Sequence, residues 1–151
     1  MAMTMKGEVA LPAARQIVWE KLNDPEVLKA CIPGCQTLER TENGGFAAVV
    51  KLKVGPVSAT FKGNVELTDL DPPNGYRIQG QGEGGIAGFA KGGAQVSLTD
   101  AEGGGTLLSY DVEANVGGKI AQLGARLIDG VAKKNADQFF ATFAEIVGQS
   151  A

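Results

Sequence analysis

A long amphipathic pattern near the C-terminal end of the sequence restricts the possible folds most strongly. Over residues 119–147, apolar side chains recur three or four positions apart, and a continuous helix of that length is roughly 43 Å long. Its apolar stripe must be buried against another layer of secondary structure, which the rest of the chain has to supply. The stripe consists of Ile120, Leu123, Leu127, Val131, Phe139, Phe143 and Ile146.

The preceding part of the sequence is typical of strands joined by short turns, and these strands can supply that layer. The turn signals are Asn43-Gly44-Gly45, Gly55-Pro56, and the loops at 71–75 and 100–105. Because short connections join neighbouring strands, we expect the strands to be antiparallel. The predicted strands cover residues 4–11, 35–42, 46–54, 57–69, 76–83, 89–99 and 106–116.

Two short helices are predicted between the first and second strands. Residues 13–22 carry apolar side chains at helical spacing, and Asp24-Pro25 offers an N-cap followed by the residue type favoured at the first helical position. Pro33-Gly34 ends the second helix. We therefore predict an α+β fold in a single domain, residues 1–151, in which a seven-stranded curved antiparallel sheet wraps around the long C-terminal helix.

Glycine is unusually abundant, with 22 residues, about twice the average share. The segment Gly80–Gly85 matches GxGxxG, but phosphate binding by that motif requires a helix directly after it. Residues 89–99 alternate like a strand instead. We interpret the glycines as positions that let strands bend. A helix lying across a strongly curved sheet leaves space for a ligand, so we expect an apolar cavity between them.

The composition excludes several classes of function. The sequence contains no histidine, which removes Ser-His-Asp and Cys-His catalysis and the usual zinc and iron ligands. Its formal net charge of −3 argues against nucleic-acid binding, which needs a basic surface. No arrangement of carboxylates predicts acid–base catalysis. We expect a protein that is not an enzyme and that has neither a metal nor a cofactor.

Two further groups of residues leave alternatives open. Cys31 and Cys35 are separated by three residues, which is not the spacing of a zinc or thioredoxin-like pair, so packing of the short helix is favoured over a redox pair. Lys119, Arg126 and Lys133 recur every seven residues on the predicted long helix. A solvated stripe is favoured there, and attraction to anionic lipid head groups or an acidic partner is the alternative.

Four stretches of the sequence resemble the carbon monoxide dehydrogenase CoxG family. They are LNDPEVLKACIPGC at 22–35, VGPVSATFKGNVEL at 54–67, GEGGIAGFAKGGAQVSL at 82–98, and residues 105–140, which contain GGKIAQLGARLID. Together they cover nearly the whole chain. The resemblance implies a START-like or Bet v 1-like helix-grip fold. It also implies a non-catalytic accessory to a carbon monoxide dehydrogenase-type molybdenum hydroxylase, aiding membrane recruitment or electron coupling.

An apolar cavity in such an accessory protein favours a carrier of a hydrophobic ligand, a lipid or a quinone. An isoprenoid quinone is the chemically sensible choice, because it is apolar and is a membrane electron acceptor. The alternative is a protein–protein adaptor or maturation factor without a physiological ligand. Large side chains filling the gap between helix and sheet would favour that alternative.

The expected location and the expected lining residues complete the prediction. Met1–Gly7 lacks the apolar core of a secretory signal, and the hydrophobic C-terminal anchor of some relatives is missing. We expect a cytoplasmic protein, with peripheral contact at the inner face of the cytoplasmic membrane as a further option. The predicted lining residues are Leu28 and Ile32 at the rim, Phe61, Val65, Phe89 and Tyr110 on strands, and Leu123, Leu127, Val131 and Asn135 on the long helix.

Overall fold

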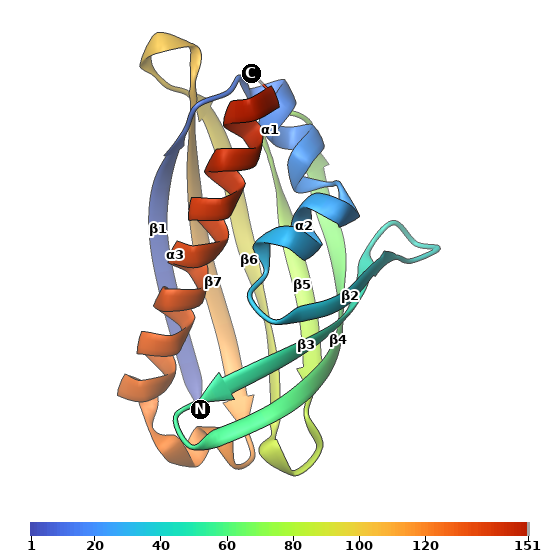
Figure 1. The fold of residues 1–151 in the computed structure, drawn as a ribbon, viewed down its shortest axis with the longest axis vertical. Coiled ribbons are helices and arrows are strands. Elements are labelled where there is room, and N and C mark those ends of the chain that lie inside the picture. The colour runs from blue at the N-terminus through green and yellow to red at the C-terminus, as the bar shows by residue number, and fades with distance from the viewer. Residues whose placement is uncertain (151) are drawn as a thin grey trace.

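The structure, a computed structural model, describes residues 1–150. Its elements follow the predicted order of one strand, two short helices, six strands and a long helix (Figure 1). The strands are β1 (Ala2–Leu11), β2 (Cys35–Arg40), β3 (Phe46–Val54), β4 (Val57–Asp71), β5 (Gly75–Glu83), β6 (Phe89–Asp100) and β7 (Thr106–Gly117). The helices are α1 (Arg15–Leu22), α2 (Pro25–Cys31) and α3 (Ala125–Ser150), with short 3-10 segments η1 (Gly85–Ala87), η2 (Glu102–Gly104) and η3 (Ile120–Leu123).

All seven strands form one sheet in the order β1-β7-β6-β5-β4-β3-β2, and every neighbouring pair is antiparallel. The predicted seven-stranded antiparallel sheet is therefore confirmed. The sheet curves around α3, and α1 and α2 lie beside the upper half of that helix (Figure 1). Asp24 caps α2 as expected, because its side chain accepts a hydrogen bond from the backbone of Glu26.

The long helix begins later than its apolar pattern predicts. Ile120–Leu123 forms the 3-10 segment η3, and Gly124 then has a φ of +95° before α3 begins at Ala125. Glycine adopts that conformation readily and other residues do not. The apolar periodicity thus continues across an interruption of the helix. None of the helices within residues 1–150 is long and apolar enough to cross a membrane.

Buried apolar side chains form two clusters, one toward each end of α3. The upper core cluster lies between the C-terminal part of α3, the two short helices and the sheet, and its centre is made by Val18, Leu98, Leu108, Phe143 and Val147. The lower core cluster lies at the N-terminal end of α3 and contains Val54, Phe61, Ala87, Val116, Ile120 and Ile128.

Thr106 is a fully buried polar residue that ties β7 to the segment before α1. Its hydroxyl donates a hydrogen bond of 2.7 Å to the carbonyl oxygen of Ala13. Thr106→Val keeps the shape and removes the donor, so the free energy of unfolding should fall by about 1–2 kcal/mol. Urea denaturation measures this change. Thr60→Val, at an exposed position of β4, is the control and should stay within about 0.5 kcal/mol of wild type; an equal loss in both would rule out the hydrogen bond as the cause.

Candidate ligand-binding cavity

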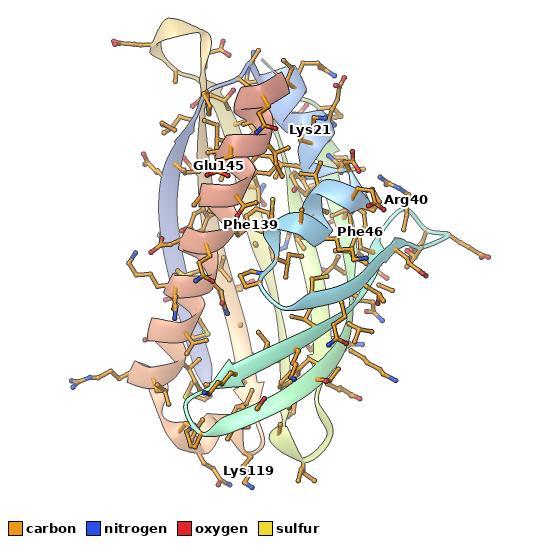
Figure 2. The ribbon with its side chains drawn as sticks, in the orientation of Figure 1. Lys21, Arg40, Phe46, Lys119, Phe139 and Glu145 are labelled. Carbon is orange, nitrogen blue, oxygen red and sulfur yellow. The ribbon has the colours of Figure 1, made fainter. Side chains whose placement is uncertain are left out.

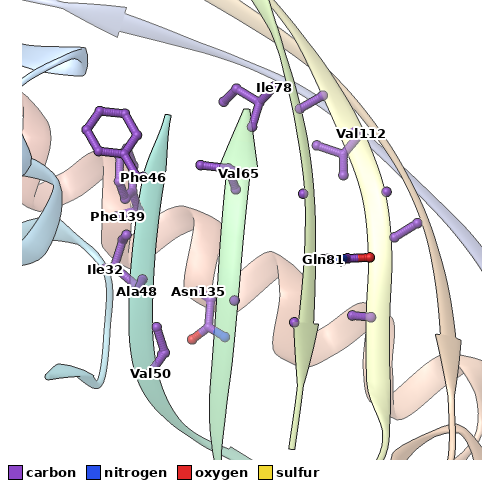
Figure 3. A pocket seen from close by; sticks show the side chains of 18 of the residues that line it. Ile32, Phe46, Ala48, Val50, Val65, Ile78, Gln81, Val112, Asn135 and Phe139 are labelled. Atoms are coloured by element: carbon purple, nitrogen blue, oxygen red, sulfur yellow. The ribbon is translucent and has the colours of Figure 1, made fainter. Parts of the chain in front are cut away.

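A cavity of about 640 Å³ lies between the concave face of the sheet and α3 (Figure 3). Its volume falls within the range of about 300–1,000 Å³ found for small-molecule sites, and its wall is almost wholly apolar. The wall comes from β2 to β7, from α1, from α2 and the turn after it, and from η3 and α3. Its larger apolar members include Leu28, Ile32, Phe46, Val50, Leu52, Phe61, Val65, Ile78, Val112, Ile120, Phe139 and Phe140.

Small residues at the centre of the sheet make room for this cavity. The strand register places Gly80 opposite Gly92, and Gly82 opposite both Gly63 and Ala90. These residues alternate with exposed ones along their strands, as expected for positions that face the concave side. We call the set the small-residue floor. It consists of Ala48, Gly63, Gly80, Gly82, Ala90, Gly92, Ala94 and Ala114.

The glycines of the floor serve two different purposes. A Cβ added at Gly92 would lie 2.1 Å from the carbonyl oxygen of Glu113, so glycine permits a close approach of β6 and β7 there. A Cβ added at Gly82 would meet nothing nearer than 3.7 Å, so that glycine leaves open space. Gly80–Gly85 belongs to β5 and the connection to β6, with no α-helix after it. The segment therefore lacks the geometry of a phosphate-binding loop.

Several apolar side chains of the wall are only half-buried although they point inward. Val65, Ile78 and Phe139 are examples, and Figure 3 shows them around the cavity. An apolar side chain beside empty space lacks the dispersion contacts of a packed core, and water gains few hydrogen bonds in such a cavity. The site therefore favours an apolar occupant.

One polar side chain of the long helix borders the apolar wall. Asn135 lies on α3 beside the cavity (Figure 3), and within residues 1–150 its amide makes no hydrogen bond to another side chain or backbone group. Lys91 and Glu113 also touch the cavity but occupy exposed positions of their strands. Asn135 can therefore donate to, or accept from, a polar group of an otherwise apolar ligand.

The structure places five of the ten predicted lining residues along the cavity wall. Two come from α2 and its C-terminal end, two from β4, and one from α3. They are Leu28, Ile32, Phe61, Val65 and Asn135.

The prediction that Phe89 lines the cavity was wrong. Phe89 begins β6, is 48% exposed, and lies with its ring over Gly117 of β7. Its neighbour Ala90 faces the cavity instead. The segment η1 in the preceding connection determines which residues of β6 face the cavity, and a shift of one residue moves a side chain to the opposite face of the sheet.

The placement of Tyr110 at the cavity was also wrong. Tyr110 alternates with exposed Asp111 and faces α3, but its ring extends over Gly7 of β1 and stacks on Phe140 at 5.3 Å. A Cβ at Gly7 would lie 2.3 Å from the tyrosine hydroxyl oxygen. The missing side chain of Gly7 therefore provides the space that the ring occupies.

Three predicted residues from the start of the long helix do not line the cavity either. The break at Gly124 separates Leu123 from α3, and Leu123 and Val131 pack against the lower core cluster. Leu127 is 37% exposed and lies against Gly55 in the turn between β3 and β4. These residues close the lower end of the fold below the cavity.

Sequence reasoning missed the lining contributed by β3, β5 and β6. In β3, Phe46, Val50 and Leu52 line the cavity, whereas Lys51 and Lys53 are exposed. The alternation of lysine with apolar residues could have identified this inward face. No comparable signal marks the glycines and alanines of the small-residue floor, because a small residue gives little indication of which face of the sheet it occupies.

Of the two cysteines, Cys31 packs in the core, whereas Cys35 is half-buried. Cys31 is buried in the upper core cluster, and burial raises the pKa of its thiol to about 11, which disfavours the reactive thiolate. Cys35 donates a hydrogen bond through Sγ to the carbonyl oxygen of Thr37 at 3.3 Å. Both are free thiols.

Comparison with known proteins gives one family and one fold. The sequence model of the CoxG family, the G subunit of carbon monoxide dehydrogenase, matches residues 7–148. A conserved protein from Geobacillus kaustophilus is 33% identical, with a TM-score of 0.92 over 98% of this chain and 97% of that chain. No curated protein sequence matches the chain.

More distant structures share the fold alone. A START superfamily protein from Mycobacterium smegmatis is 15% identical, with a TM-score of 0.71 over 98% of this chain and 99% of its own. The Zhui aromatase/cyclase from Streptomyces sp. R1128 is 17% identical, with a TM-score of 0.69 over 97% of this chain and 94% of its own. The predicted helix-grip architecture is confirmed by these likenesses.

Proposed function

The chain belongs to the carbon monoxide dehydrogenase CoxG family, and from this premise we propose that it is a non-catalytic carrier of an apolar ligand for a carbon monoxide dehydrogenase-type molybdenum hydroxylase. The observation that carries the proposal is the cavity of about 640 Å³ with its almost wholly apolar wall. An adaptor without a ligand has no need of such a space, and large side chains would stabilise it better. This sheet instead presents alanine and glycine at its centre.

An isoprenoid quinone matches the chemistry of this wall. Its prenyl chain would lie along the small-residue floor, and a carbonyl oxygen of its head group would accept a hydrogen bond from the amide of Asn135. A quinone is also the acceptor that a soluble oxidoreductase requires from the membrane. The carrier would therefore work in the cytoplasm, with peripheral contact at the inner face of the cytoplasmic membrane.

The titratable groups at the cavity support a non-catalytic role. Tyr76 lines the wall, and burial raises the pKa of its phenol above the ordinary value. The phenol therefore stays protonated and is a poor general base. Lys91 and Glu113 touch the cavity but occupy exposed strand positions, where water competes with a ligand for them.

Native mass spectrometry of the full chain tests the carrier proposal. The protein is purified without detergent, incubated with vesicles containing an isoprenoid quinone and separated from them, and the mass of the resulting species is then measured. We expect a complex of protein with one quinone. A folded protein that neither retains nor takes up quinones, with circular dichroism as the check on folding, contradicts the proposal and leaves the adaptor role.

Asn135 should determine which apolar ligands bind best. Asn135→Leu removes the amide and is expected to weaken quinone binding about two- to twelvefold, the value of one hydrogen bond of about 0.5–1.5 kcal/mol. Binding of the matching hydrocarbon chain without oxygen should be unchanged or stronger. Competition against a fluorescent fatty acid measures both affinities. An equal loss for both ligands would mean that Asn135 acts through packing rather than through its amide.

A further inference from the structure

Most of the exposed large hydrophobic side chains lie at one end of the molecule. Among residues 1–150, five large hydrophobic side chains are exposed, and Leu70, at 55%, lies at the end of β4 near α1. The other four lie where the N-terminal end of α3 meets the turns after β3, β5 and β7. They are Met1 (41%), Ile86 (88%), Phe89 (48%) and Leu127 (37%). We call this region, at the bottom of Figure 1, the basal end.

Close backbone packing joins two of the connections at the basal end. A Cβ added at Gly118 would lie 2.3 Å from the Cα of Gly88, so the connection after β5 lies directly against the connection after β7. The ring of Phe89 covers Gly117 at the same place. Ile86 lies at the tip of the first connection, in η1, and is almost fully exposed.

The remaining two side chains reach the basal end from α3 and from the chain start. Leu127 lies over Gly55 in the turn between β3 and β4. The amine of Met1 donates a hydrogen bond of 2.8 Å to the carbonyl oxygen of Val116, near the end of β7. Three segments that are distant in the sequence, namely the chain start, the η1–β6 segment and α3, thus bring their apolar side chains to one end of the fold.

Exposed cations surround these apolar side chains. They are Lys53, Lys91, Lys119 and Arg126, and Figure 2 shows Lys119 at the lower extremity of the molecule. The four ion pairs found within residues 1–150 involve other cations. Acidic residues near this end include Glu83, opposite Phe89 in the strand register, and Asp129, three positions after Arg126.

The positive charge of this end is local, because the chain as a whole has a net charge of −3. Acidic residues gather instead in the turns at the opposite end. Asp69, Asp71, Asp100 and Glu102 all lie there, and among these four, within the part of the chain that the structure describes, only Asp100 is paired, with Arg15. A negatively charged surface would therefore orient the molecule with its basal end forward.

We propose that the basal end docks on an anionic lipid bilayer, with Ile86 and Phe89 entering the interface and the four cations contacting lipid head groups. This rests on the proposed function and deepens its peripheral membrane contact by naming the surface that makes it. Separate apolar side chains ringed by unpaired cations suit a bilayer interface, where side chains and head groups adjust to one another. A folded protein partner requires instead a broad complementary face of about 800 Å².

Flotation with lipid vesicles tests the docking surface. We expect the wild-type chain to float with vesicles of equal parts phosphatidylcholine and phosphatidylglycerol, to bind pure phosphatidylcholine weakly, and to dissociate as salt is raised. Ile86→Asp should weaken binding about tenfold. Because Ile86 is 88% exposed, this change should leave the fold intact. The double variant Lys91→Glu, Lys119→Glu should weaken binding at least as much, since each cation near an anionic surface contributes about fivefold.

Matched variants at the opposite end are the controls. Leu70→Asp removes an exposed apolar side chain, and Lys21→Glu reverses a charge on α1 (Figure 2); both should bind vesicles as the wild type does. The proposal is overturned if wild type fails to bind anionic vesicles or if the controls lose binding equally. It is also overturned if Ile86→Asp abolishes a dimer seen by ultracentrifugation while vesicle binding stays unchanged.

Failure of docking and failure of the carrier role can be told apart. A variant with a filled cavity, Gly82→Leu, should still float with anionic vesicles, because Gly82 faces the cavity and not the basal end. Conversely, Ile86→Asp should still take up a quinone supplied in detergent micelles. Loss of vesicle binding in Gly82→Leu would contradict a docking surface that is separate from the cavity.

Discussion

Replacing Gly82 by leucine is expected to abolish loading of an apolar ligand while leaving the protein folded. Gly82 faces the cavity from β5, and a Cβ added there would meet nothing nearer than 3.7 Å. Its backbone is outside the left-handed region, so a side chain is tolerated. The leucine would occupy space that the ligand needs, and we expect the apparent affinity to fall at least about tenfold, which corresponds to about 1.4 kcal/mol.

The control for this variant is Gln79→Leu. It adds a leucine to the same strand at an exposed position, on the opposite face of the sheet. Displacement of a fluorescent fatty acid measures ligand affinity in both variants, and native mass spectrometry measures quinone loading. Wild-type loading by Gly82→Leu would show that ligands bind somewhere other than this cavity. The filled variant should still capture the partner oxidoreductase in a pull-down.

Gly92→Ala is expected to destabilise the protein by about 3 kcal/mol, the upper end of the cost of overpacking. The new Cβ would lie 2.1 Å from the carbonyl oxygen of Glu113 and 2.7 Å from the Cα of Ala114. Both atoms belong to the backbone of β7, so the clash can be relieved only by separating β6 from β7. The curvature that encloses the cavity depends on this close approach.

Gly82→Ala is the matched comparison and should change stability in the opposite direction. Its Cβ enters open space, and alanine reduces the conformational freedom of the unfolded chain, so a gain of about 0.5 kcal/mol is expected. Urea denaturation of both variants gives the two free energies of unfolding. Equal effects at the two positions would contradict the distinction between a glycine that allows close packing and a glycine that leaves space.

The order of elements was predictable because the long apolar stripe and the turn signals are local features. The strand over residues 46–54 was predicted with the bounds that the structure has. The later start of α3 was not predicted, because the apolar stripe continues through η3. Gly124 interrupts the helix without interrupting the spacing of the apolar residues. Periodicity reports the spacing of side chains, not the conformation between them.

The positions of individual side chains at the cavity depended on contacts that sequence patterns do not record. Tyr110 turns away from the cavity because Gly7, on a strand distant in the sequence, leaves space for its ring. Phe89 faces outward because of the conformation of the connection before it. Gly82 and Gly92 look alike in the sequence, yet one borders open space and the other touches the neighbouring strand. The sequence alone could therefore not predict whether the cavity is open.

A crystal structure of the wild-type chain loaded with an isoprenoid quinone tests most directly whether the cavity holds an apolar ligand. The expected result is elongated, continuous electron density between α3 and the small-residue floor, with a carbonyl oxygen within hydrogen-bonding distance of Nδ2 of Asn135. Phe139 and Phe140 should remain on the wall as they are now. A contradictory result would be a cavity closed by these two rings, with no density in it and with the quinone bound elsewhere or absent.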